Sequence, residues 1–132
     1  MRSRYPSPST SLLVTRDDEI IFQSDGKWLY PLFDLEDHLN NTQQNLRRTI
    51  VWDKVIGKAS ALLLTYLKAE RVHGELISDL AFDVFEHFQI PLTYDQRVPR
   101  IKCKTEMLLL DINDPDQAYQ ILSKRAKRCW LE

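Results

Sequence analysis

Clusters of apolar positions predict strands and helices in the first half of the chain. Residues 12–15 and 19–24 are apolar, β-branched runs separated by a polar stretch that begins at Arg16, which predicts a β-hairpin. From Pro31, leucines recur at positions 32, 35 and 39, the spacing of one helical face. Residues 40–45 are polar, and we expect them to form a loop.

The segment 49–68 is the most informative part of the sequence. Residues 49–52 are β-branched and aromatic and predict a short strand, and residues 54–68 predict an almost wholly apolar helix. Asp53 is the predicted N-cap, because its carboxylate can accept hydrogen bonds from the first free backbone N–H groups. A helix that starts at a strand end is where α/β proteins place ligands, since backbone N–H groups and the helix dipole point outward there.

The second half of the chain continues the alternation of strands and helices. Residues 71–76 and 92–95 predict strands, whereas residues 105–110 are compatible with a strand or a short helix. Helix starts with capping signals lie at Ser78 and at Asp114, the latter followed directly by proline. This order predicts an α/β sandwich with a hairpin at one edge of a mostly parallel sheet.

The composition indicates one globular domain. The chain has 132 residues, of which 43% are hydrophobic, and this is enough for a core. We expect the domain at residues 12–126, between a disordered tail rich in serine and proline at residues 1–11 and a C-terminal tail at residues 127–132. The N-terminus lacks the apolar core of a signal peptide, and the two cysteines form no CxxC motif. A cytoplasmic protein with reduced thiols is therefore expected.

Charge and hydropathy argue against nucleic-acid and membrane partners. The formal net charge of −1 gives no general attraction to nucleic acid. No apolar run approaches the roughly 18 residues needed to span a bilayer. Residues 124–128 are basic and are either a nucleic-acid patch or the usual cationic complement to the dipole at a helix C-terminus. The absence of any other basic cluster favours the second interpretation.

Asp53, Lys54, Gly57 and Lys58 form the densest cluster of chemically capable residues. Lys54 and Lys58 are one helical turn apart, so they form either a solvated edge or, near the positive end of the helix, a site for an anionic or carbonyl group. Asp53 is either a plain cap or a group that orients a hydrogen-bond donor. A glycine inside a helix costs about 0.8–1 kcal/mol relative to alanine. Gly57 is therefore explained either by close packing of another backbone or by room for a ligand.

A second candidate cluster combines Cys103 with Glu106. The two residues share one face if this segment is helical, and the lysines on either side of the thiol would favour a nucleophilic thiolate. The alternative is a small, half-buried cysteine in a basic loop. The three histidines show no spacing typical of metal ligands, so no metal is expected.

The order of motifs along the chain resembles a known family. The most specific piece is D-K-V-x-G-K-A at residues 53–59, and it is followed by ERVHGELIS, IPLTYDQRVPRI, CKTEM and DINDPDQAY. Over residues 12–124 the sequence resembles the uncharacterised prokaryotic family called domain of unknown function 1893. Members are thought to have the cytidine-deaminase-like fold. The resemblance therefore implies a three-layer α/β/α sandwich, with a mixed sheet of about five strands and an N-terminal hairpin.

The zinc motifs of deaminases are missing from this sequence. Zinc deaminases carry H-x-E or C-x-E at one helix start and P-C-x-x-C at the next. The corresponding positions near Asp53 and Ser78 hold neither histidine nor cysteine, so a zinc-dependent deaminase is disfavoured. Tyr94 and Asp95 match the family's Y-D-x-x-V-P motif. At Cys103 the chain departs from the family's C-P-x-E, because lysine replaces the proline.

These observations lead to one functional hypothesis and one alternative. We expect a zinc-free protein of deaminase-like fold, without a cofactor, that binds a small polar metabolite at the helix start around Asp53. The alternative is a non-catalytic oligomeric interaction or scaffold module, and a homo-oligomer is expected because related folds commonly self-associate. Whether any reaction is catalysed stays open. The candidate catalytic residues are Asp53, Lys54, Cys103 and Glu106, and the candidate ligand-binding residues are Gly57, Lys58, Tyr94 and Asp95.

Overall fold

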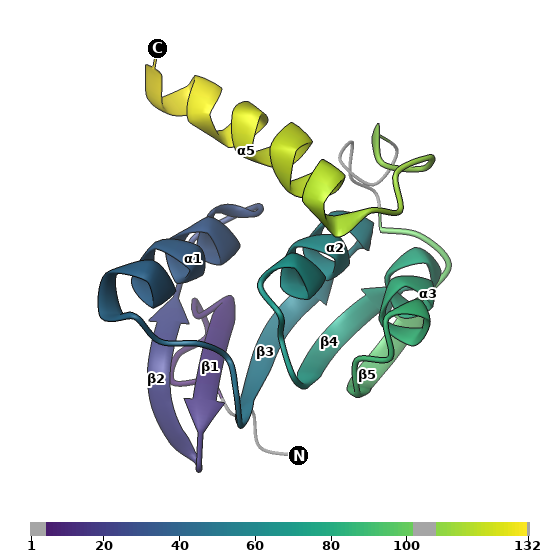
Figure 1. Cartoon of the computed structure of the whole chain (residues 1–132). Coiled ribbons are helices and arrows are strands. Elements are labelled where there is room, and N and C mark those ends of the chain that lie inside the picture. Colours follow the sequence, from purple (N-terminus) through teal and green to yellow (C-terminus); the bar gives the residue numbers. More distant parts are fainter. Residues whose placement is uncertain (1–4, 102–107, 132) are drawn as a thin grey trace.

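The computed structural model describes residues 5–101 and 108–131 and shows an open α/β fold (Figure 1). The strands are β1 (Leu12–Arg16), β2 (Glu19–Ser24), β3 (Thr49–Ile56), β4 (Val72–Ser78) and β5 (Leu92–Val98). The helices are α1 (Tyr30–Thr42), α2 (Lys58–Tyr66), α3 (Asp79–His87) and α5 (Pro115–Leu131). Within this part of the chain no helix is long and apolar enough to cross a membrane.

The strands form one mixed sheet in the order β2-β1-β3-β4-β5. β1 pairs antiparallel with both β2 and β3, whereas β3, β4 and β5 run parallel. The mixed five-stranded sheet with a hairpin at its edge is therefore confirmed. At the tip of the hairpin Asp17 and Asp18 have φ angles of 53° and 66°. Positive φ at both residues is typical of the type I′ turn, whose twist matches that of the strands it joins.

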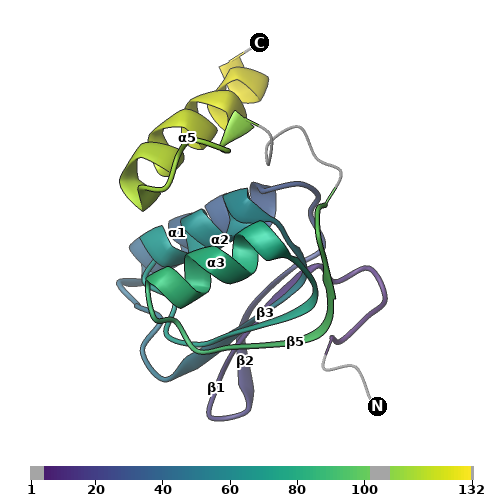
Figure 2. The same ribbon diagram turned by 90° about the vertical axis from the view of Figure 1, so that its right-hand side faces the viewer.

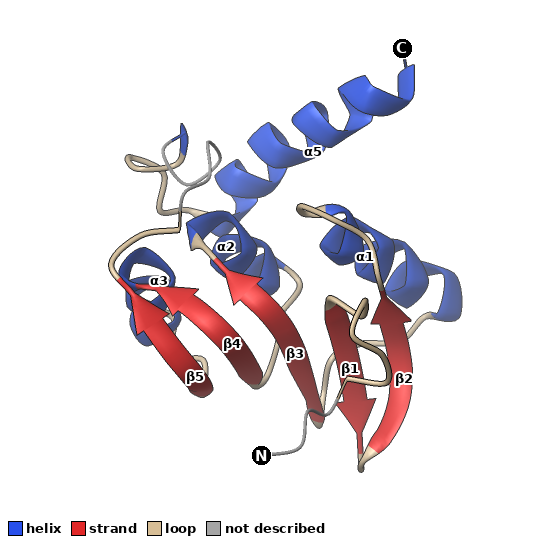
Figure 3. Ribbon diagram, turned by 180° about the vertical axis from the view of Figure 1, so that it is seen from behind, coloured by secondary structure: helices blue, strands red, loops and turns tan. Residues whose placement is uncertain are grey.

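The helices α1, α2 and α3 lie on the same face of the sheet, and α5 lies over α2 on the side away from the strands (Figure 2). Seen from behind, the other face carries no helix in the described segments (Figure 3). The three-layer α/β/α arrangement is therefore not confirmed. The strand order explains the one-sided cover, because right-handed crossovers from β3 to β4 and from β4 to β5 step in the same direction. Such crossovers place their helices on the same side.

The uncovered face carries a row of side chains that crosses four strands. The indole nitrogen of Trp52 donates a hydrogen bond to the Thr15 hydroxyl at 3.0 Å. The Trp52 ring lies 5.1 Å from the imidazole of His73, centroid to centroid. His73 Nδ1 in turn lies 2.6 Å from the Thr93 hydroxyl. These contacts join β1, β3, β4 and β5 laterally where no helix covers them.

Helix α2 begins later than the sequence predicts. β3 continues to Ile56, and Gly57, with φ −95° and ψ −174°, is the N-cap of a helix that starts at Lys58. Asp53 is therefore a strand residue, and its prediction as the N-cap is wrong. The physical reason is the sheet: Val55 and Ile56 pair with the parallel strand β4, and β-branched side chains fit this pleated surface better than a first helical turn.

The other helices also differ at their ends. Helix α1 continues to Thr42 through positions predicted to be a loop. Helix α5 continues to Leu131, past the expected end of the domain at residue 126. Its start agrees with the prediction: Pro115 is the first helical residue, and the carboxylate of Asp114 accepts a hydrogen bond from the backbone N–H of Gln117 at 3.2 Å.

The burial pattern changes phase inside β3 and β4. Val51 and Ile56 are both fully buried although they are five positions apart, and the same holds for Val72 and Ile77. In a regular strand residues an odd number apart point to opposite faces. Gly74 makes this possible, because a Cβ at this position would lie 2.6 Å from Cγ2 of Ile77 and 2.9 Å from Cδ1 of Ile56. Asp53, paired with Gly74, stands where the phase changes.

The predicted cap of α3 is confirmed and gives a stability prediction. The buried Ser78 hydroxyl accepts a hydrogen bond from the backbone N–H of Ala81 at 3.1 Å. We expect Ser78→Ala to lower the free energy of unfolding by about 1 kcal/mol, because an N–H of the first turn loses its acceptor. Ser78→Gly should cost less, since glycine is tolerated at this position. Urea denaturation measures both. A larger loss for glycine than for alanine would contradict capping as the cause.

Candidate functional site

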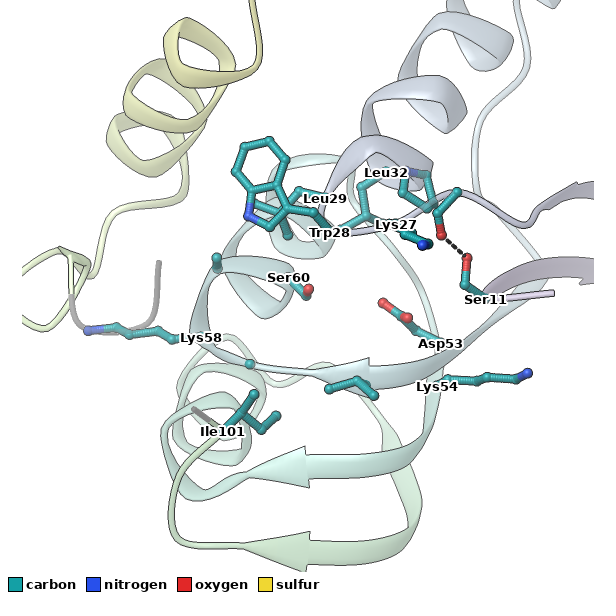
Figure 4. A pocket seen from close by; sticks show the side chains of 15 residues that line it. Ser11, Lys27, Trp28, Leu29, Leu32, Asp53, Lys54, Lys58, Ser60 and Ile101 are labelled. Atoms are coloured by element: carbon teal, nitrogen blue, oxygen red, sulfur yellow. Dashed lines mark hydrogen bonds between the residues drawn. The ribbon is translucent and has the colours of Figure 1, made fainter. Parts of the chain in front are cut away.

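A cavity of about 350 Å³ lies where the starts of α1 and α2 meet the end of β3 (Figure 4). Its wall comes from separate parts of the chain, which the fold brings together: Ser11, residues 26–29, Pro31 and Leu32, residues 53–55, residues 57–60 and Ile101. The carboxyl ends of parallel strands are the usual ligand-binding edge of an open α/β sheet. The volume is within the range of small-molecule sites.

The Asp53 carboxylate points into this cavity (Figure 4). Burial raises the pKa of Asp53 from 3.8 to about 7, and hydrogen bonds from the backbone N–H groups of Val55 and Lys54 act against this rise. Desolvation disfavours the ionised form of a carboxyl group. Near neutral pH this carboxyl group is therefore present in both protonation states. It can accept a hydrogen bond when ionised and donate one when protonated.

The amino end of α2 forms the other side of the cavity. Its N-cap, Gly57, provides no side-chain cap, and the first intrahelical bond runs from the N–H of Ala61 to the carbonyl of Gly57 at 3.0 Å. The earlier N–H groups of the first turn, at Ala59 and Ser60, thus have no intrahelical acceptor. The Ser60 side chain also faces the cavity, although the residue is only 7% exposed (Figure 4). Its hydroxyl makes no hydrogen bond to any residue that the structure describes.

Lys54 and Lys58 line the cavity, but their amines extend away from Asp53 (Figure 4). The Lys54 amine donates to the carbonyl of Pro8 at 2.6 Å and lies 5.1 Å from the centre of the Tyr5 ring. The Lys58 side chain is buried, 3% exposed, and its amine donates to the carbonyl of Leu110 at 3.0 Å. Both amines therefore hold other parts of the chain against the body of the protein.

Trp28 is a cavity residue that the sequence analysis did not single out. It has φ 56° and is 38% exposed, and its ring packs edge-on against Tyr30 with centroids 5.1 Å apart. A bulky residue in the left-handed region is uncommon, and such strain often marks a functional position. The available signal was a tryptophan in the polar loop just ahead of the helix that starts near Pro31. Ser11 and Ser60 were also missed, because a single serine carries no pattern.

Two comparisons with known proteins place the chain in a family. The family model described as TM1506, domain of unknown function (DUF1893), matches residues 7–125. The chain belongs to the DUF1893 family. A crystal structure of a DUF1893 family protein (TM1506) from Thermotoga maritima is similar, with a TM-score of 0.81 and 27% sequence identity. The match covers 89% of this chain and 81% of that chain. A comparison with curated proteins gives no significant match.

Of the remaining candidate residues of this DUF1893 protein, the two that the structure describes lie apart from the cavity. Tyr94 and Asp95 are on β5 and are not part of the cavity wall. The Tyr94 ring packs edge-on against Phe82 with centroids 6.3 Å apart, and the Asp95 carboxylate lies 3.4 Å from Nε2 of His73. Cys103 and Glu106 fall outside the described residues. The cavity thus brings together Asp53, Lys54, Gly57 and Lys58.

The described part of this DUF1893 protein contains no cluster suited to a metal ion. Within residues 5–101 and 108–131, no group of three or more histidine, cysteine, aspartate or glutamate side chains is placed to hold one. Among the described residues that line the cavity, Asp53 alone carries a carboxylate. The polar groups that described residues contribute to the cavity include this carboxyl group, the hydroxyls of Ser11 and Ser60, and the backbone at the start of α2.

Proposed function

We propose that this DUF1893 protein is a zinc-free domain of deaminase-like fold that binds a small polar metabolite in the cavity at Asp53. The observation that carries the proposal is the convergence of two polar side chains, one partly buried and one buried, on the same cavity. The Asp53 carboxyl group and the Ser60 hydroxyl both face the same cavity. Desolvation of a carboxyl group is costly in a folded protein, and binding sites are where such costs are retained.

The remaining wall of the cavity supports a binding role. Leu29, Leu32 and Ile101 provide apolar surface, and the exposed ring of Trp28 provides a flat face. Ligand sites are typically apolar concavities with a few placed polar groups that fix the orientation of the ligand. The element order, with its hairpin followed by alternating helices and strands, supports the deaminase-like fold. The helix starts hold no zinc-ligating histidine or cysteine in the sequence.

A metabolite library screened by thermal shift tests this proposal. We expect at least one small polar compound to raise the Tm of the wild-type protein, because a ligand that binds only the folded state stabilises it. Asp53→Asn and Ser60→Ala should each weaken its binding by about tenfold or more, since each removes a polar contact in a desolvated site. Isothermal titration then measures the affinity of each variant.

Matched variants at exposed positions provide the controls. Asp83→Asn on α3 and Ser9→Ala ahead of β1 change the same chemical groups outside the cavity, and both should leave the affinity unchanged. If every ligand binds the Asp53→Asn and Ser60→Ala variants as tightly as the wild type, the cavity is not the binding site.

A further inference from the structure

We propose that the ligand of this cavity is a small zwitterion, with its ammonium group against Asp53 and its carboxylate at the amino end of α2. This inference rests on the proposed function, because it names the chemical class of the compound that the cavity binds. The inference follows from the two sides of the cavity, because Asp53 favours a cation and the amino end of α2 favours an anion. No described residue forms an ion pair with Asp53, and none caps the start of α2 with a side chain.

The Asp53 side of the cavity calls for a cation. The carboxylate is partly buried beside apolar walls and makes no ion pair with a described residue. The amines of Lys54 and Lys58 are bonded to backbone carbonyls. Lys27, the third lysine of the wall, makes no ion pair with Asp53. A buried carboxylate without a counter-charge is costly, and a ligand ammonium would provide the missing partner.

The α2 side of the cavity calls for an anion. Helix α2 begins at Lys58 without a side-chain cap and without an acidic residue in its first turn. Free N–H groups and the positive end of the dipole therefore point toward the cavity, and such helix ends bind carboxylates and phosphates. The independent second observation is Ser60, which is nine-tenths buried, aimed into the cavity, and without a hydrogen-bond partner in the described chain. Its hydroxyl is placed to donate to the same anionic group.

Only a molecule with both charges satisfies both sides. A simple anion would be repelled by the Asp53 carboxylate. A simple cation would be repelled by the positive end of the α2 dipole. A zwitterion pairs each charge with its complement and adds no net charge to the cavity. The volume of about 350 Å³ suits a compound of amino-acid size. The apolar side chains at Leu29, Leu32 and Ile101 would cover the carbon skeleton of such a compound.

Isothermal titration of the wild-type protein with free amino acids tests the inference. The panel contains glycine, leucine, β-alanine and 4-aminobutanoate, which vary the separation of the two charges. For the tightest binder, the primary amide removes the carboxylate and the N-acetyl derivative removes the ammonium. We expect each derivative to bind about tenfold more weakly or worse, because one buried charge then loses its partner. Equal affinity of either derivative would overturn the zwitterion.

The site variants connect each charge of the ligand with its wall. Asp53→Asn should weaken the free amino acid about tenfold while leaving the N-acetyl derivative unchanged or tighter, because the lost interaction is with the ammonium. Ser60→Ala should weaken the free amino acid and leave the amide unchanged. Asp83→Asn and Ser9→Ala are the matched controls. The series of derivatives uses only the wild-type protein, so it decides the question even if a variant fails to fold.

The outcomes separate this inference from the proposed function. One outcome is that no amino acid binds but a neutral metabolite from the library does, and that its binding requires Asp53. This outcome would overturn the inference of a zwitterionic ligand and support the proposed binding function. If no compound of either set binds, both are overturned. Binding of the free amino acid with the expected loss for both derivatives supports both.

Discussion

Replacing Asp53 with asparagine should make the protein more stable at pH 8 and leave its stability nearly unchanged near pH 4. Burial raises the pKa of this carboxyl group to about 7 in the folded protein, against an ordinary value of 3.8. Below about pH 4 the group is protonated in both the folded and the unfolded state, so it does not lower the free energy of unfolding. Between pH 4 and pH 7 only the unfolded state releases the proton freely, so the wild type loses stability as the pH rises.

The expected size of this effect is large for a single substitution. The difference between the two pKa values corresponds to at most about 4 kcal/mol in the free energy of unfolding at pH 8. Asparagine keeps the shape of the side chain and one acceptor oxygen, but it carries no charge to be desolvated. Denaturation in urea at pH 4, 6 and 8 measures the difference between variant and wild type at each pH. We expect this difference to grow with pH.

The exposed residue Asp83 provides the matched control. Asp83→Asn should change the free energy of unfolding by less than about 0.5 kcal/mol at every pH, as is usual for surface substitutions. A loss of stability for Asp53→Asn that is the same at pH 4 and pH 8 would contradict the prediction. In that case the carboxyl group would contribute hydrogen bonds to the fold without any cost of desolvation.

Replacing Gly74 with alanine should destabilise the protein by about 2–3 kcal/mol, because overpacking a filled core forces neighbours to move. The new Cβ would lie 2.6 Å from Cγ2 of Ile77, a branch methyl close to the backbone that cannot move by a simple rotation. It would also lie 2.9 Å from Cδ1 of Ile56. Urea denaturation of the purified variant measures the loss.

A second substitution shows whether this contact is the cause. Ile77→Leu moves the branch from Cβ to Cγ and removes the nearest methyl, so Gly74→Ala should cost less in the Ile77→Leu background. Gly26→Ala is the comparison at another glycine, where the nearest heavy atoms to the new Cβ are 3.3 Å away, and it should cost clearly less. Equal losses for Gly74→Ala and Gly26→Ala would contradict the packing argument.

Much of the fold could be predicted from local patterns. The hairpin follows from two apolar runs around a polar turn, and the starts of α3 and α5 follow from Ser78 and Asp114 as caps. These features depend on a few neighbouring residues, so the sequence shows them directly. The mixed sheet with its hairpin at one edge follows from the order of the elements.

The start of α2 could not be placed from local patterns. Asp53 is an excellent capping residue, yet pairing with β4 extends the strand to Ile56. Long-range pairing of this kind overrides local preference. The change of phase near Gly74 also breaks the alternation that marks a strand face. The one-sided helical cover depends on the direction in which the strand order proceeds, which the sequence does not display.

Part of the cavity wall could be predicted as one cluster from the sequence, whereas other parts could not. The cluster from Asp53 to Lys58 does surround one cavity. The roles expected for the two lysines conflict with their contacts, because carbonyl groups distant in sequence occupy both amines. Trp28 and Ser60 reach the cavity through the fold alone, from the loop before α1 and from the first turn of α2.

The row that links Thr15, Trp52, His73 and Thr93 determines what stabilises the face of the sheet that no helix covers. Cohesion there comes from lateral contacts between neighbouring strands, without a layer of helices. Backbone amides on such a surface open locally at lower free energy than those beneath a packed helix. Hydrogen–deuterium exchange of backbone amides should therefore be faster at this face of the sheet, and the amides of the helix-covered core should exchange last.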